Sequence, residues 1–121
     1  MAAMPNPTIL ALMAHPDDAE FLCAGALFLL ADLGCEIHVA AMAPGDCGSP
    51  DKPAEEIAAI RREEGRQAAA LYPGEFHCLE ERDLQIHYSP ATTRKACSLL
   101  RRVRPGIVIT QSPIDYMLDH E

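Results

Sequence analysis

The stretch TILALMAHPDDAEFLCAGALFLLADLG, residues 8–34, decides the fold class of the chain. Residues 8–13 form a short apolar run, which is typical of a buried strand, and AHPDDA at 14–19 follows as a turn. Residues 20–33 then have the length and composition of a helix, which Gly34 ends. A strand that leads through a tight turn into a helix indicates an α/β protein.

The same alternation of short apolar runs and helical patterns continues along the rest of the chain. The further predicted strands are 35–43, 76–79 and 106–110, the further helices are 54–71 and 90–103, and 44–53 is a loop rich in Gly and Pro. Strands joined in sequence by right-handed helical crossovers predict a doubly wound parallel sheet of order 3-2-1-4. We therefore expect an α/β fold that is truncated after its fourth strand.

Length and composition indicate one globular domain over residues 1–121, because 49% of the residues are hydrophobic and 23% are charged. A formal net charge of -8 repels phosphate backbones, so we expect no nucleic-acid partner. Five cysteines without a CxxC pair fit a reducing cytoplasm. The longest apolar stretch, 21–31, is shorter than the roughly 20 residues that cross a bilayer, and we expect no membrane insertion.

The first predicted helix is apolar on every side. Between Phe21 and Leu33 only Asp32 is polar, and a helix of this kind has to be covered all round. The four predicted strands cover only one of its faces. We therefore expect a fragment of a longer domain, or a homo-oligomer in which a partner subunit covers the remaining face.

Histidine and carboxylate residues follow the first and the fourth predicted strands. His15, Asp17 and Asp18 lie in the turn after the first strand. After the fourth strand, the segment QSPIDYMLDHE at 111–121 contributes Asp115, Asp119 and His120. In the order 3-2-1-4 these two strands are neighbours, so their following loops face one another across the crevice where such sheets bind ligands.

His15, Asp18 and His120 would then offer two imidazoles and one carboxylate to a single ion. Three protein ligands with an open position are typical of catalytic zinc, and the same set also suits non-haem iron. The competing interpretation is that Asp17 or Asp18 only caps the following helix, where acidic side chains complement the helix dipole. That interpretation leaves the two histidines unexplained.

Four segments resemble the LmbE/PIG-L family of zinc-dependent N-acetylglucosaminyl deacetylases. They are AHPDDAE at 14–20, MAPGDCGS at 42–49, IRREEGRQAAALY at 60–72 and PIDYMLDHE at 113–121. The resemblance implies a Rossmann-like, three-layer α/β/α fold. It covers only about the first half of a family domain, so the chain is expected to lack the C-terminal half.

The resemblance also implies roles for individual residues. His15, Asp18 and His120 become zinc ligands, with Fe²⁺ as the alternative metal, Asp17 becomes the general base, and Arg61 meets the substrate. The implied reaction removes an acetyl group from an N-acetylated amino sugar, so the expected partner is a small N-acetyl sugar conjugate. One position departs from the family, because Met117 stands where many members carry a histidine that helps to stabilise the oxyanion, and a thioether cannot donate a hydrogen bond.

Two alternatives to an enzyme are a non-catalytic Rossmann-like module that binds a metal or a sugar nucleotide, and an inactive fragment that works only in an assembly. The turn at 14–20 lacks the GxGxxG pattern that admits a pyrophosphate, which argues against the dinucleotide version of the module.

The remaining polar residues are interpreted as structural. His38, His77 and His87 have no second ligand at a useful spacing along the chain, and Asp46 is expected to order its Gly-rich loop by bonding the backbone of that loop. Arg62 is expected to form a solvated pair with a neighbouring acid on its own helix.

Overall fold

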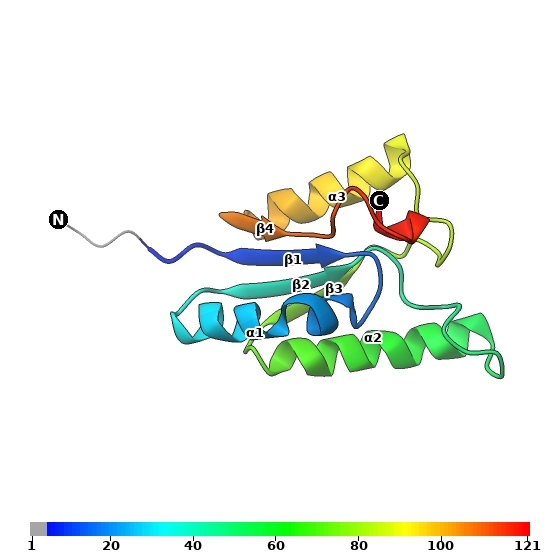
Figure 1. Cartoon of the computed structure of the whole chain (residues 1–121), viewed down its shortest axis with the longest axis horizontal. Helices are drawn as coiled ribbons and strands as arrows, with labels where there is room; N and C mark the ends of the chain where they lie inside the picture. The colour runs from blue at the N-terminus through cyan, green and yellow to red at the C-terminus, as the bar shows by residue number, and fades with distance from the viewer. Residues whose placement is uncertain (1–4) are drawn as a thin grey trace.

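Four parallel strands form one sheet of order β3-β2-β1-β4 in the computed structural model, which describes residues 5–121 (Figure 1). The strands are β1 (Ile9–Met13), β2 (Ile37–Ala41), β3 (Glu75–Cys78) and β4 (Ile107–Ile109). β1 pairs with β2 on one side and with β4 on the other. The predicted strand order is confirmed.

Helices cover both faces of the sheet, which gives three layers. In Figure 1, α1 (Asp18–Asp32) and α2 (Ala54–Ala70) lie below the sheet, and α3 (Pro90–Val103) lies above it. Side chains alternate between the faces because the strand period is two. Ile9 and Val39 belong to the core cluster that includes Leu27 of α1, whereas Leu10 and Ala40 pack with Leu99 of α3.

All seven predicted elements are present, with shifts at their ends. The first helix begins at Asp18, two residues before the predicted start at 20, because Asp17 adopts the N-cap position with a φ of 83°. β2 is shorter than predicted at both ends. A short 3-10 helix, η1 (Leu118–His120), was not predicted, and it turns the last residues back toward the end of β1 (Figure 1).

The outer face of α1 is uncovered, as its sequence predicted. Leu27 is fully buried against the sheet, whereas Phe21 is 84% exposed and Leu29 is 67% exposed. The sheet thus covers one stripe of the helix and leaves a broad apolar surface open. Within residues 5–121, no helix combines the length and the hydropathy needed to cross a membrane.

Candidate metal centre

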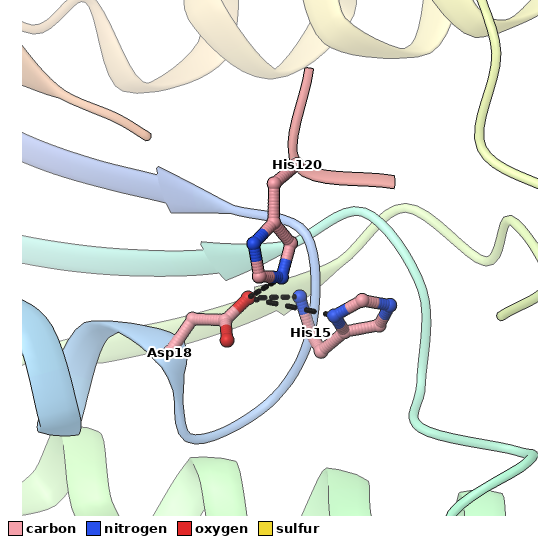
Figure 2. Close-up of side chains that lie close together, drawn as sticks. All are labelled: His15, Asp18 and His120. Atoms are coloured by element: carbon pink, nitrogen blue, oxygen red, sulfur yellow. Dashed lines mark hydrogen bonds and ion pairs between the residues drawn. The ribbon is translucent and has the colours of Figure 1, made fainter. Parts of the chain in front are cut away.

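Three side chains from distant parts of the chain meet at the carboxyl ends of β1 and β4. His15 follows β1, Asp18 is the first residue of α1, and His120 lies in η1. Figure 2 shows that both imidazoles face the Asp18 carboxylate, whose Oδ2 lies 3.6 Å from His15 Nδ1 and 3.7 Å from His120 Nε2. The parallel pairing of β1 with β4 produces this convergence, because it places the loops that follow the two strands side by side.

Each imidazole is held by a second carboxylate through its other nitrogen. His15 Nε2 lies 2.8 Å from Asp119 Oδ2, and His120 Nδ1 lies 2.9 Å from Asp115 Oδ1. An ionised carboxylate only accepts hydrogen bonds, so these two nitrogens donate. When the rings are neutral, His15 Nδ1 and His120 Nε2 therefore present lone pairs toward Asp18. Metal-binding histidines almost always have this arrangement, in which the second nitrogen donates to a carboxylate or carbonyl.

Asp119 holds the His15 ring in place, a role that the sequence analysis did not predict. Its carboxylate is buried, and besides His15 it accepts hydrogen bonds from the backbone N–H groups of Leu84 (2.7 Å) and Ile86 (3.3 Å). These bonds fix the carboxylate and, through it, the orientation of the His15 ring. The only signal in the sequence was the position of Asp119 next to His120.

Gln111, which follows β4, positions the Asp18 carboxylate. Its amide Nε2 donates to Asp18 Oδ2 at 3.1 Å, while its Oε1 accepts from the backbone N–H of Ala14 at 3.0 Å. The backbone N–H of His15 also donates to Asp18 Oδ2, at 2.8 Å. Both sides of the crevice therefore orient the Asp18 carboxylate.

The electrostatics of the cluster favour an ion pair when no metal is bound. A hydrogen bond donated to the Asp18 carboxylate, helped by one to Asp119 and opposed by burial, raises the pKa of His15 to about 9. Burial alone would raise the pKa of Asp18, but the His15 imidazolium and backbone N–H lower it below its usual value. A cation bound here would take the place of the His15 proton.

The Asp17 side chain contacts Arg61. Asp17 occupies the N-cap position with a left-handed backbone, and its side chain makes no capping hydrogen bond. Arg61 Nη2 donates to Asp17 Oδ2 at 2.6 Å and to the Pro16 carbonyl at 2.9 Å, and Arg61 Nη1 donates to Glu64 at 3.0 Å. Left-handed geometry in a non-glycine residue is strained and is often found at functional sites.

A cavity of about 650 Å³ borders the cluster on the α3 side of the sheet. His120 and Asp119 contribute polar atoms to its wall, whereas Met42, Tyr88 and Leu118 make other parts of it apolar or aromatic. Such a mixture of apolar surface with a few converging polar groups is typical of small-molecule sites.

Two structural interpretations made from the sequence are corrected. Asp46 does not order its own loop, because its Oδ1 accepts from the backbone N–H of Asp83 (2.8 Å), and Asp83 in turn binds the N–H groups of Gly45 and Cys47. Arg62 pairs with Glu80 of another segment rather than with an acid on its own helix.

His38 and His77 were interpreted as structural because the spacing along the chain offered no second ligand, but the structure brings the two side chains together. His38 Nδ1 lies 2.9 Å from His77 Nε2 across the β2–β3 pair. Spacing along the chain could not show this contact, because the register of the two strands places His38 opposite Glu75 and Ala40 opposite His77.

Comparison with known proteins finds relatives over most of the chain. Diacetylchitobiose deacetylase from Thermococcus kodakarensis is 29% identical over 108 residues, which are 87% of this chain and 40% of the relative. 4-Oxalmesaconate hydratase from Pseudomonas putida is 27% identical and covers 96% of this chain and 48% of the relative. The chain thus spans less than half the length of either protein.

A solved structure shows the same fold. N,N'-diacetylchitobiose deacetylase from Pyrococcus horikoshii superposes with a TM-score of 0.85 at 29% identity, over 93% of this chain and 45% of that one. The family model for GlcNAc-PI de-N-acetylase, PIG-L, matches residues 10–121, which is nearly the whole chain. The chain therefore belongs to the PIG-L family.

Proposed function

We propose that this chain carries the metal-binding part of a hydrolase that removes an acetyl group from an N-acetylated amino sugar or a related amide. The observation that carries the proposal is the convergence of His15, Asp18 and His120, with each imidazole anchored by a further carboxylate. The deacetylases among its relatives support the same reaction class.

The three side chains fit a divalent metal in number and in chemistry. Two imidazole nitrogens and one carboxylate oxygen form the ligand set of many catalytic zinc sites, and the same set suits Fe²⁺. The ligand atoms lie within 4.8 Å of one another, so one ion can reach all three. When bound, a divalent ion at such a site supplies Lewis acidity to an amide carbonyl and increases the acidity of water.

Asp17 is the proposed proton carrier. It accepts a proton from the attacking water and returns it to the leaving amine nitrogen, while the C–N bond breaks and acetate and a free amine depart. Its side chain is 44% exposed and directly precedes Asp18 in the chain, so substrate can approach it. Arg61 already donates to Asp17, and we assign it to orient this carboxylate and to bind a hydroxyl or phosphate group of the substrate.

A metal-dependent hydratase is the second candidate. The observation that favours it is the hydratase relative, which is nearly as similar to this chain as the deacetylase and covers more of it. Met117 adds to this, because the thioether offers no hydrogen bond to the oxyanion of amide hydrolysis. Hydration of a carbon–carbon double bond forms a different anion, so substrate assays separate the two activities.

One experiment tests the metal site and the reaction together. The purified chain, Asp17→Asn and His120→Ala are dialysed and their zinc content is measured. Acetate release from N,N'-diacetylchitobiose and from N-acetylglucosaminyl-phosphatidylinositol is followed in parallel. We expect His120→Ala to hold one ion fewer per chain than the wild type. Asp17→Asn should keep the metal and lose about 100-fold or more of the rate, since proton transfer contributes about 10²- to 10⁴-fold.

His87→Ala is the matched control for metal content, because His87 is exposed, its ring nitrogen bonds the backbone carbonyl of Gln85, and it does not belong to the cluster of His15, Asp18 and His120. Equal metal content in His120→Ala and the wild type would refute the metal site. Metal retention by the wild type without acetate release, but with hydration of an unsaturated dicarboxylate, would replace the deacetylase by the hydratase.

A further inference from the structure

A second cluster of histidines and carboxylates lies at the opposite edge of the sheet. His38 is near the start of β2, and Glu75 and His77 belong to β3. His38 Nδ1 lies 2.9 Å from His77 Nε2 and 3.8 Å from Glu75 Oε2. The two imidazoles are buried, with relative exposures of 7% and 8%, whereas the Glu75 side chain is 68% exposed. One atom from each residue can be chosen so that all three lie within 4.8 Å of one another.

The hydrogen bonds of the cluster define which nitrogens are free. His38 Nε2 lies 2.9 Å from Glu36 Oε1 and must donate to it, because a carboxylate accepts. When His38 is neutral, its Nδ1 therefore has a lone pair, and His77 Nε2 donates to that lone pair. His77 Nδ1 in turn accepts from Arg102 Nη2 of α3 at 3.1 Å.

His38 thus has the environment of a metal ligand before any metal binds. One nitrogen donates to a carboxylate and the other presents a lone pair to a second imidazole and a second carboxylate, which is the usual arrangement around metal-binding histidines. Glu36 and Glu75 also place two negative charges against the single positive charge of Arg102.

We propose that His38 Nδ1, His77 Nε2 and Glu75 form a second binding site for a divalent transition metal such as Zn²⁺. Imidazole nitrogen and carboxylate oxygen are ligands that zinc accepts. Ligand nitrogens on a tetrahedral zinc ion are about 3.3 Å apart for bonds of about 2.0 to 2.1 Å. The two nitrogens, now 2.9 Å apart, therefore need to separate by a few tenths of an ångström, and the rings need to turn so that both lone pairs point at the ion. The exposed Glu75 side chain is free to adjust.

Arg102 competes with the metal. Its hydrogen bond to His77 Nδ1 requires a lone pair there, which keeps the ring proton on Nε2, the atom that has to bind the ion. Binding moves that proton to Nδ1 and releases the Arg102 side chain, which is exposed and can leave without burying a charge. Removal of Arg102 should therefore raise the metal affinity.

The predicted role of this ion is to join β2 to β3. The cluster lies within β2 and β3, whereas His15, Asp18 and His120 lie beyond the carboxyl ends of β1 and β4. A ligand set that spans two strands holds the edge strand β3 to the sheet, as structural zinc sites stabilise folds.

The test uses a chain in which the first site is disabled by His15→Ala and His120→Ala. This background is titrated with Co²⁺ and with Zn²⁺ while visible absorption and heat of binding are recorded. We expect one ion per chain. Adding Glu75→Ala or His38→Gln should abolish or strongly weaken binding, Glu36→Gln should weaken it about 10- to 100-fold, and Arg102→Leu should strengthen it.

Glu75→Ala changes only an exposed side chain, so a loss of binding in this variant is not caused by unfolding. Circular dichroism checks the fold of each variant. Absence of Co²⁺ and Zn²⁺ binding in the background would overturn the proposal. Binding that persists unchanged in Glu75→Ala and His38→Gln would overturn it too, because the ion would then lie elsewhere. Both outcomes are independent of the deacetylase proposal, which rests on the first site.

Discussion

At the scale of single residues, the titration of His15 contributes to the stability of the fold. The metal-free chain raises the pKa of His15 from 6.5 to about 9, mainly through its hydrogen bond to Asp18. The folded chain therefore binds one more proton than the unfolded chain between these two values. This contribution to stability is complete below pH 6.5 and is lost as the pH rises through 9.

We expect the free energy of unfolding of the metal-free chain to fall by at most about 3 kcal/mol over this range, since each pKa unit corresponds to about 1.4 kcal/mol. Urea unfolding in the presence of a chelator, at several pH values across the range, measures it. His15→Gln is the control. Cysteine side chains of the unfolded state also ionise in this pH range, and their effect on the free energy of unfolding is the same in both chains. An identical pH dependence of the free energy of unfolding in the two chains would disprove the contribution of His15.

At the scale of elements, Gly74, which lies between α2 and β3, packs closely against the backbone of β2 and of the end of α2. A Cβ atom at this position would lie 2.7 Å from the Ile37 carbonyl oxygen and 3.2 Å from that of Ala69. Both atoms belong to backbone that cannot move without disturbing β2 or the end of α2. By contrast, a Cβ atom at Gly25, on the exposed side of α1, would meet nothing within 4 Å.

Gly74→Ala and Gly25→Ala should therefore change stability in opposite directions. We expect Gly74→Ala to lower the free energy of unfolding by about 1 to 3 kcal/mol, as overpacking does. Gly25→Ala should raise it by roughly 0.5 to 1 kcal/mol, because alanine loses less backbone entropy in a helix. Urea unfolding of the two variants measures both effects, and destabilisation by Gly25→Ala would show that the outer face of α1 is not free.

At the scale of the whole molecule, the uncovered face of α1 is the main unpartnered surface that the sequence predicted. Leu22, Leu29 and Leu33 follow one another at helical spacing and are 65%, 67% and 70% exposed. Contiguous apolar surface of this kind usually marks an interaction site. The homo-oligomer therefore stays a prediction, and the stripe of Leu22, Leu29 and Leu33 is the surface through which it would form.

We expect the chain to self-associate through this stripe, so that its sedimentation coefficient rises with concentration. Leu29→Glu should abolish the rise, because a charge in the middle of the contact has to be desolvated. Leu71→Glu is the matched control, with 68% exposure outside the stripe. A wild-type chain that sediments as a monomer at every concentration, or equal behaviour of the two variants, would rule out this interface.

Local sequence determined the elements, and the usual strand order of doubly wound sheets then predicted the order of the strands. Apolar runs, Gly34 and the Gly- and Pro-rich loop marked the ends of strands and helices because these signals act over a few residues. The order 3-2-1-4 then placed the loops after β1 and β4 together, so His15, Asp18 and His120 could be predicted to converge.

Only the tertiary structure decided which side chains hold His15, Asp18 and His120 in place. Asp119 lies 104 residues from His15, and Gln111 lies 93 residues from Asp18. The pairing of His38 with His77 likewise depends on the register of β2 against β3. Hydrophobic periodicity encodes which face of an element is buried, but a hydrogen bond between distant residues depends on register and rotamer, which only the packed molecule selects.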